Sequence, residues 1–405
     1  MRLAQFMGRK AFGVIIGLVC VGVLVGGVGR GAASKGHGKR STSSAAVTLK
    51  PVKRPRPPAR YALPPRVRHV SSSAQLRAAL SNRRTETIVL APGVYDNPRP
   101  FVDARGDRIY SARLGRAVLT AGIVLGSGHG ASGALIRGLT FDVTDPSKAS
   151  QGAEVLVWGS ATGASVLDTR FDGNGVVGAG LVVRQPNGFV ARRIVATRFL
   201  SYGVEVDPND DGFTTNSPYS LRDLTISQVS RQVPGSSDGT AEACLWLGSP
   251  GKVQRVSVRS CALSGIWTGT ALKNALVEDA TIRDARVGIY MEHYTTASTF
   301  ERLRIGPGVS RGVNAEWDNP AVGGKPASVD NVIEGARIQS THVGVYLDQG
   351  TTRTTIRRCV FVGQDWAAIG DYKGVDNSYY RNNFKGIDPG ALRVSLLPDP
   401  GTPNP

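Results

Sequence analysis

A strand motif that starts at a glycine or an alanine recurs along most of this chain. It starts at Gly180, Gly203, Ala243, Gly265, Gly288, Gly312, Gly344 and Ala368. The intervals between starts are 23, 40, 22, 23, 24, 32 and 24 residues, so the basic repeat is close to 23 residues and two repeats carry inserted loops. A fixed period above about 20 residues is typical of a solenoid, in which each repeat buries its apolar face against its neighbours.

The repeat predicts an all-β fold, a parallel β-helix of about ten coils between residues 71 and 387. Side chains alternate in direction along a strand, and the positions expected to point inward are apolar: Leu181, Val183, Val204, Val206, Ile266, Ile289, Val313 and Val345. An earlier strand in each coil, such as the one at residues 280–282, adds a second apolar column. The leucine-rich-repeat signature is absent, and a two-sheet sandwich would not keep this register.

Residues 71–95 show how such a helix begins. Ser71, Ser72 and Ser73 lead into an amphipathic segment at residues 74–80, which predicts a short capped helix. A strand at residues 87–95 follows and ends in a Pro-Gly turn. This segment resembles the start of proteins of the pectate-lyase-like superfamily, which are right-handed parallel β-helices, because the open end of the stack needs a cover. The resemblance implies that fold for residues 71–390.

The net charge of +18 belongs mainly to the N-terminal part of the chain. Residues 1–70 contain 14 of the 49 basic residues and no acid, which leaves 35 basic and 31 acidic residues in the remainder. Arg2, Arg9 and Lys10 precede an uncharged run at residues 11–29, which at about 1.5 Å per residue can just cross a bilayer core of about 30 Å. We expect residues 1–34 to be a cleaved signal peptide or an uncleaved signal anchor. Residues 35–70, rich in Pro, Ser and basic residues, predict a disordered stalk.

Export implies a protein that is secreted or anchored to the outer face of the cytoplasmic membrane. Its N-terminal segment would contact the membrane, and no nucleic-acid partner is expected. Outside the N-terminal segment, the cysteines are Cys244, Cys261 and Cys359, an odd number without metal-ligand spacing. Because the repeat places Cys244 and Cys261 at different heights along a coil, we expect buried, unpaired thiols. Residues 391–405 predict a C-terminal tail.

The outward positions of the motif form two columns that indicate a functional face. One column contains Arg184, Asp207, Glu292, Glu316 and Asp348, and the other contains Trp267, Tyr290 and Tyr346. Coils lie about 4.8 Å apart, so carboxylates on successive coils repel each other by about 1 kcal/mol per pair in water. A shared proton, a bound cation or a basic neighbour such as His293 must offset this repulsion.

Two further features favour a carbohydrate site on this face. Exposed aromatic rings are platforms for sugar faces. Inserted loops at residues 208–220 and 319–328 leave the same end of these strands, and insertions on one face of a solenoid usually mark its binding surface. We expect Glu292, Glu316 and Asp348 to be catalytic, and a polysaccharide substrate to contact Arg184, Asp207, Trp267, Tyr290, His293 and Tyr346.

Three functions fit this face, and the sequence favours a glycoside hydrolase. Carboxyl groups on neighbouring coils match the separation of about 5–5.5 Å in retaining enzymes, and those two coils apart match the 6.5–9.5 Å of inverting enzymes. Glu292 with Asp348 is then an inverting pair, and Glu316 with either neighbour is a retaining pair. The resemblance to polygalacturonase-type hydrolases is architectural, and the Gly-His-Gly triplet at residues 128–130 is expected to be a turn.

A polysaccharide lyase or uronate epimerase is the second possibility. Tyr202-Gly203 followed by residues 207–210 (Asp-Pro-Asn-Asp) resembles a segment of the mannuronan epimerases, although two extra residues intervene and Asn replaces a His. An acidic groove suits a polyanionic substrate only if a cation such as Ca²⁺ bridges the two, and no other cofactor is indicated. The third possibility is a carbohydrate-binding or adhesin solenoid without catalysis.

Overall fold

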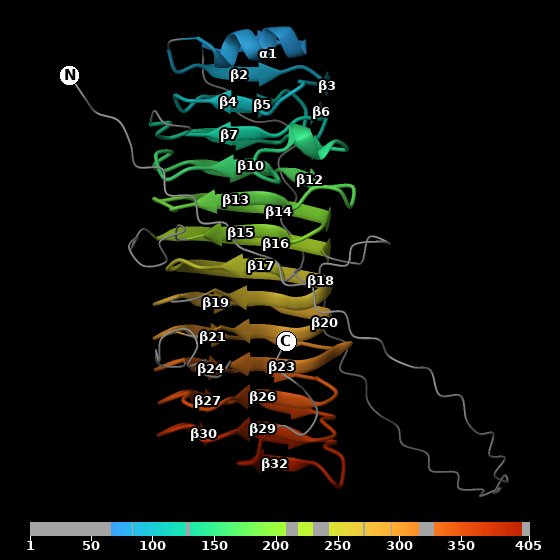
Figure 1. Ribbon diagram of the computed structural model, residues 1–405, viewed down its shortest axis with the longest axis vertical. Helices are drawn as coiled ribbons and strands as arrows, with labels where there is room; N and C mark the ends of the chain where they lie inside the picture. Colours follow the sequence, from blue (N-terminus) through green and yellow to red (C-terminus); the bar gives the residue numbers. More distant parts are fainter. Residues whose placement is uncertain are drawn as a thin grey trace, which may run out of the picture. The chain divides into compact units, whose positions relative to one another are not determined.

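The computed structural model describes residues 66–82, 84–126, 130–207, 218–229, 243–269, 272–292, 294–315 and 328–398. These residues form a right-handed parallel β-helix whose coils stack along one axis, with α1 (Ser73–Leu80) over the first coil (Figure 1). The expected signal segment, most of the expected stalk and most of the two inserted loops lie outside the described residues, although residues 219 and 220 of the first predicted loop belong to a strand.

Every coil contributes strands to three parallel stacks, each held by in-register pairing between successive coils. Stack 1 runs through β1 (Arg68–Val70), β2 (Thr87–Leu90), β5 (Arg108–Ser111), β8 (Leu135–Arg137), β11 (Ser165–Leu167), the first parts of β14 (Val190–Phe199), β16 (Tyr219–Val229) and β18 (Gly251–Thr268), then β19 (Leu276–Glu278), β21 (Thr299–Glu301), β24 (Val332–Glu334), β27 (Thr355–Arg357) and β30 (Ser378–Tyr380).

Stack 2 follows stack 1 within each coil. It runs through β3 (Gly93–Tyr95), β6 (Ala117–Leu119), β9 (Thr140–Asp142), β12 (Arg170–Asp172), the later parts of β14 and β16, the middle of β18, the first part of β20 (Thr281–Met291), β22 (Arg304–Ile305), β25 (Arg337–Ile338), β28 (Val360–Val362) and β31 (Asn383–Lys385).

Stack 3 contains the repeated motif and positions the candidate site. It runs through β4 (Phe101–Asp103), β7 (Ile123–Leu125), β10 (Ala153–Val157), β13 (Ala179–Arg184), β15 (Tyr202–Asp207), β17 (Ala243–Leu247), the ends of β18 and β20, β23 (Val309–Ala315), β26 (Val343–Leu347), β29 (Ala367–Asp371) and β32 (Leu392–Ser395). In the described part of the chain this stack has twelve strands, more than the ten or so coils predicted, because the first coils lack the motif. Strands β1 and β32 also extend the helix beyond the predicted bounds of 71 and 390.

The inward positions predicted from the motif are confirmed. Leu181, Val204, Ile289 and Val345 are fully buried, and Phe141 stacks on Phe171 of the next coil with ring centroids 5.3 Å apart. At the N-terminal end, the Ser72 side chain accepts a hydrogen bond from the Gln75 backbone N–H and so caps α1, as the serine run predicts.

A glycine column at the corner before stack 3 explains why the motif begins as it does. A Cβ on Gly312 would lie 2.2 Å from the carbonyl oxygen of Gly344 in the next coil and 2.4 Å from Ile338 Cγ2. The corner therefore excludes a side chain in most coils. The strand register places Glu154 and Cys244 at this same position in two other coils.

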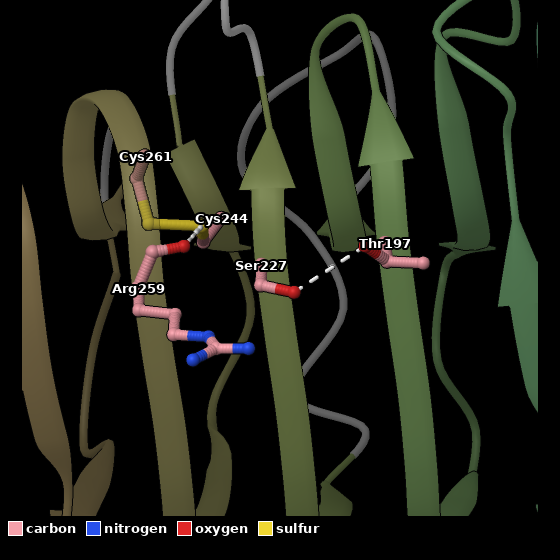
Figure 2. The surroundings of a disulfide bond; sticks show 5 residues. All are labelled: Thr197, Ser227, Cys244, Arg259 and Cys261. Atoms are coloured by element: carbon pink, nitrogen blue, oxygen red, sulfur yellow. Dashed lines mark hydrogen bonds between the residues drawn. A yellow bond between two sulfur atoms is a disulfide. The ribbon is translucent and has the colours of Figure 1, made fainter.

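Cys244 forms a disulfide with Cys261, so the prediction of unpaired thiols is wrong for these two cysteines (Figure 2). Cys244 stands in the glycine column, and Cys261 lies in the stack 2 part of β18, which belongs to the next coil. The two side chains therefore meet at one corner of the helix, and the bond ties two coils together. Cys359 is a buried free thiol, as predicted.

Candidate functional site

The outer face of stack 3 carries one continuous column of large and polar side chains. The register aligns Glu205, Trp246, Trp267, Tyr290, Asn314 and Tyr346 on successive coils. A parallel column near the strand ends contains Arg184 opposite Asp207. The stack therefore places the predicted aromatic residues on the same face as Arg184 and Asp207, with Trp267 two coils from Asp207 and Tyr346 five coils from it.

An ion-pair cluster occupies the β13–β15 part of this face. Nη1 of Arg184 lies 3.2 Å from Oε1 of Glu205 and also contacts Oδ2 of Asp207. The side chains of Glu205 and Asp207 are only 12% and 11% exposed. Burial raises the pKa of the Glu205 carboxyl, and the Arg184 guanidinium opposes part of that rise. This face thus holds a protonatable carboxyl beside a fixed positive charge.

Glu205 is a site residue that the sequence analysis did not select. The sequence alone allows two alignments of the repeat at Ala243 that differ by one residue, so it does not identify the neighbour of Glu205 on the next coil. In the structure Cys244 takes the glycine position and Trp246 points outward beside Glu205. The Gly-to-Cys replacement in the motif, followed by Leu245 at an inward position, is the sequence signal that could have found this alignment.

Two half-buried tryptophans continue the face beyond Glu205. The ring centroids of Trp246 and Tyr202 are 6.4 Å apart. Residue 269 is a glycine, and a Cβ at this position would lie 2.2 Å from the Trp246 ring. On the next coil, Trp267 donates a hydrogen bond from Nε1 to Oε2 of Glu292 over 3.1 Å. The two indoles form an aromatic surface with Glu205 at one side and Glu292 at the other.

Tyr290 and Tyr346 do not form the exposed platform that the sequence predicts. Their exposed fractions are only 4% and 5%. Tyr290 packs edge-on against Trp267 with ring centroids 4.8 Å apart, and Tyr346 packs beneath the Arg311 guanidinium at 5.6 Å. These tyrosines support neighbouring side chains, and the accessible rings on this face belong to tryptophans.

The predicted carboxylate trio is only partly within the described residues. Pairing of Met291 with Ala315, and of Ala315 with Leu347, places Glu292 and Asp348 two coils apart, about 9.6 Å along the stack. Oδ1 of Asp348 accepts a hydrogen bond of 2.7 Å from the Gln349 backbone N–H. Glu316 and His293 lie outside the described residues, so their predicted roles stay predictions.

A second aromatic group lies farther along the same face. Tyr346 lies 6.0 Å from Trp366, and Trp366 stacks on His342 with ring centroids 5.6 Å apart. Nδ1 of His342 lies 3.0 Å from Oδ1 of Asp365. The motif predicted Tyr346 but not His342, Asp365 or Trp366, because these three residues lie outside it.

The described residues provide no group of three or more His, Cys, Asp or Glu side chains that could hold a metal ion. We therefore derive no step through Ca²⁺. No helix within the described ranges combines the length and apolar character needed to cross a membrane.

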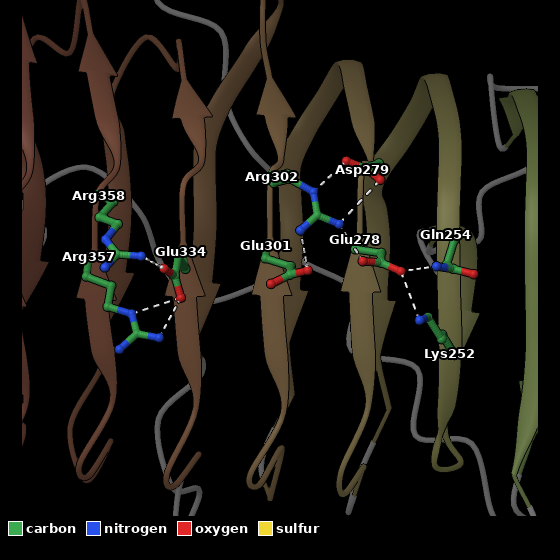
Figure 3. A network of polar contacts seen from close by, with 9 residues as sticks. All are labelled: Lys252, Gln254, Glu278, Asp279, Glu301, Arg302, Glu334, Arg357 and Arg358. Atoms are coloured by element: carbon green, nitrogen blue, oxygen red, sulfur yellow. Dashed lines mark hydrogen bonds and ion pairs between the residues drawn. The ribbon is translucent and has the colours of Figure 1, made fainter. Parts of the chain in front are cut away.

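Three acidic residues do lie on successive coils, but on stack 1: Glu278, Glu301 and Glu334 (Figure 3). Arg302 pairs with Glu278, Asp279 and Glu301, and Glu334 pairs with two arginines, Arg357 at 2.6 Å and Arg358 at 2.7 Å. Burial raises the pKa of Glu278, but hydrogen bonds from Gln254, Lys252 and Arg302 outweigh it and bring that pKa to about 2. Basic partners on adjacent coils lower the pKa of Glu278 and of Glu334, so this column braces the stack and is a poor candidate for acid–base catalysis.

Comparisons with known proteins define the class of fold. No family model matches the chain. The Ras modification protein ERF4 of Yarrowia lipolytica is 36% identical over 55 residues, which are 14% of this chain and 28% of that protein. The chain thus spans well under a third of that relative's length, and a match this short identifies no family.

Solved structures match most of the described fold. Alginate lyase AlyF-OU02 in complex with G6 has a TM-score of 0.58 at 12% identity, covering 83% of this chain and 89% of that chain. PfbA, a surface adhesin of Streptococcus pneumoniae, has a TM-score of 0.56 at 9% identity, covering 82% and 92%. The catalytic unit of a GH87 α-1,3-glucanase from Streptomyces thermodiastaticus has a TM-score of 0.51 at 13% identity, covering 86% and 73%.

At such identities the likeness concerns the fold alone. The chain has the right-handed parallel β-helix fold that its resemblance to the pectate-lyase-like superfamily predicts.

Proposed function

We propose that this protein binds a neutral polysaccharide across the outer face of stack 3 and hydrolyses it by carboxylate acid–base chemistry. The observation that carries the proposal is the position of Glu205. It is a largely buried carboxyl group with a raised pKa, next to the half-buried indole of Trp246 on the adjacent coil. A carboxyl group with a raised pKa beside a sugar platform is suited to protonating a glycosidic oxygen.

Glu205 and Asp207 are the carboxyl pair that we assign to this reaction. Both carboxyl groups contact Nη1 of Arg184. The distance between their two contacting oxygens therefore cannot exceed the sum of the two oxygen–nitrogen distances. That limit favours the separation of about 5–5.5 Å found in retaining glycosidases over the 6.5–9.5 Å of inverting ones. Glu205 donates its proton to the glycosidic oxygen as the C–O bond breaks, and Asp207 attacks the anomeric carbon. Water then releases the sugar, with Glu205 accepting the proton of that water.

Glu292 with Asp348, the pair predicted from the motif, is the alternative for an inverting reaction. Their separation of two coils suits that mechanism. However, Glu292 accepts the Trp267 N–H, which fits a role in holding the indole platform. The Glu205 pair is therefore the stronger assignment.

The charges on this face favour a neutral substrate over a polyuronate. Arg184 is engaged by two carboxylates, and Arg311 donates to Asn314 over 3.0 Å while it covers the Tyr346 ring. Binding a uronate carboxylate at either arginine would cost an existing contact. The solved structures with this fold include an alginate lyase, an α-1,3-glucanase and a surface adhesin by their names, so lyase activity and binding without cleavage are the competing outcomes.

We further propose that the β-helix works outside the cytoplasm, either secreted or anchored at the membrane. The basic, apolar N-terminal segment supports export. The Cys244–Cys261 disulfide supports it independently, because such bonds persist mainly in oxidising compartments.

The test is release of reducing ends by the purified full chain from α-1,3-glucan, β-1,4-glucan and alginate. We expect activity on a neutral glucan and a loss of about 10²–10⁴-fold in Glu205→Gln, since a general acid contributes that much. Glu334→Gln is the matched control, because this carboxyl lies on stack 1, and its activity should equal that of the wild type.

The competing functions give other results. A new absorbance from unsaturated uronates on alginate would assign a lyase. Glycan binding without any cleavage would assign a binding protein. Full activity in Glu205→Gln together with loss in Glu292→Gln would move the chemistry to the alternative pair.

A further inference from the structure

The second aromatic group on stack 3 has the features of a sugar subsite. Trp366 is half-buried, and its ring lies nearly parallel to that of His342, with an angle of 20° between the planes. Tyr346 braces the indole from the buried side at 6.0 Å. A partly exposed aromatic ring that its neighbours hold in place suits the apolar face of a pyranose ring.

The backbone under this group leaves room for the two rings. A Cβ on Gly370 would lie 2.8 Å from Cδ2 of Tyr346 and 3.0 Å from Cζ3 of Trp366. Both rings therefore lie close over Gly370, in the column that holds Tyr346 on the preceding coil. Close packing against Gly370 and Tyr346 therefore holds Trp366 in position.

Polar groups stand at the edge of the rings. His342 Nδ1 lies 3.0 Å from Asp365 Oδ1, and the Asp365 side chain is 58% exposed. Imidazole and carboxylate groups can both exchange hydrogen bonds with sugar hydroxyls. The group thus combines a stacking surface with hydrogen-bonding partners, which is the chemistry that a carbohydrate requires.

The register fixes how far this group lies from the tryptophans of the candidate site. Trp267 pairs with Tyr290, Tyr290 with Asn314, and Asn314 with Tyr346. Three coils separate Trp267 from Tyr346, about 14 Å along the axis, and Trp366 lies one coil farther, about 19 Å from Trp267. Both groups lie on the outer face of the same stack, so one extended glycan chain running along the axis can contact both.

We propose that Trp366, His342 and Asp365 form a distal sugar-binding subsite, and that the polysaccharide lies along the helix axis between it and Trp267. This inference rests on the proposed carbohydrate function of the same face. It adds a prediction that the proposed function lacks. The affinity for the glycan should depend on the length of the glycan, and this dependence should arise from the coil that contains Trp366.

The test is calorimetric titration of the full chain with cello-oligosaccharides and α-1,3-gluco-oligosaccharides from the disaccharide to the octasaccharide. Wild-type affinity is expected to increase once the ligand is long enough to reach both groups. Trp366→Ala should weaken octasaccharide binding by about five- to tenfold and leave disaccharide binding unchanged. Tyr380→Ala removes an exposed aromatic ring on stack 1 and should change neither.

Further variants guard against a folding defect. Trp366→Phe keeps a ring and should retain most of the octasaccharide affinity, and His342→Ala should reproduce part of the loss. Identical length dependence in Trp366→Ala and the wild type overturns the subsite while leaving the proposed function intact. Failure of the wild type to bind or cleave any neutral glycan overturns both.

Discussion

Removal of the Cys244–Cys261 disulfide should lower the free energy of unfolding by about 3 kcal/mol. The bond joins residues 17 apart in sequence, and closing a loop of that size restricts the unfolded chain by about this amount. The perturbation is the double variant Cys244→Ala with Cys261→Ala. The assay is urea unfolding of the full chain, followed by tryptophan fluorescence without reductant.

Cys359→Ala is the matched control because it removes a buried thiol that has no bridge. It should cost only the packing and hydrogen bonding of one side chain, on the order of 1 kcal/mol. Peptide mapping after alkylation of the denatured, unreduced protein should find Cys359 labelled and both Cys244 and Cys261 protected. Alkylation of Cys244 and Cys261 under those conditions would refute the reasoning, as would a double variant that is no less stable than the control.

Three further predictions concern stability. Gly312→Ala should lower the free energy of unfolding by about 1–3 kcal/mol, because its Cβ would lie 2.2 Å from a backbone oxygen. Gly390→Ala is the control and should change it little, since a Cβ there would meet nothing within 4 Å. Equal effects of the two variants in thermal unfolding would contradict this. Burial raises the pKa of Glu154, so its contribution to stability should fall as pH rises above 4.5. Glu154→Gln should therefore reduce the fall in stability with pH in urea titrations at several pH values. Burial raises the pKa of Asp168, but hydrogen bonds from arginines, Arg193 foremost, lower it overall. The stabilisation by Asp168 should therefore be present above about pH 4 and disappear in acid. An unchanged acid transition in Asp168→Asn would exclude this.

The sequence predicted the fold because each repeat corresponds to one coil, and stacking of the coils requires the same residue types at the same positions. Inward residues such as Val204 and Ile289 are apolar in every coil that keeps the motif, and the glycine before them stands where a Cβ would strike the next coil. The early coils escaped the count because β4 and β7 are strands of only three residues, although Gly122 stands at the glycine position before β7. The disulfide was missed for a related reason: Cys244 replaces the glycine, which hid its register.

The site was predicted less completely, since burial of an outward position depends on its neighbours. Alternation correctly assigned Tyr290 and Tyr346 to the outer face, yet both are buried there against Trp267 and Trp366. The raised pKa of Glu205 arises from burial, which no spacing rule reports. Charge pairing between coils was likewise invisible until the register aligned the acids of stack 1 with their arginines.

The most direct measurement of the central claim is a crystal structure of the Glu205→Gln variant with a bound neutral oligosaccharide. The account predicts sugar rings over Trp246 and Trp267, with a glycosidic oxygen within hydrogen-bond distance of residue 205 and the chain directed towards Trp366. An oligosaccharide bound on stack 1 or stack 2, with stack 3 empty at saturating ligand, would contradict it.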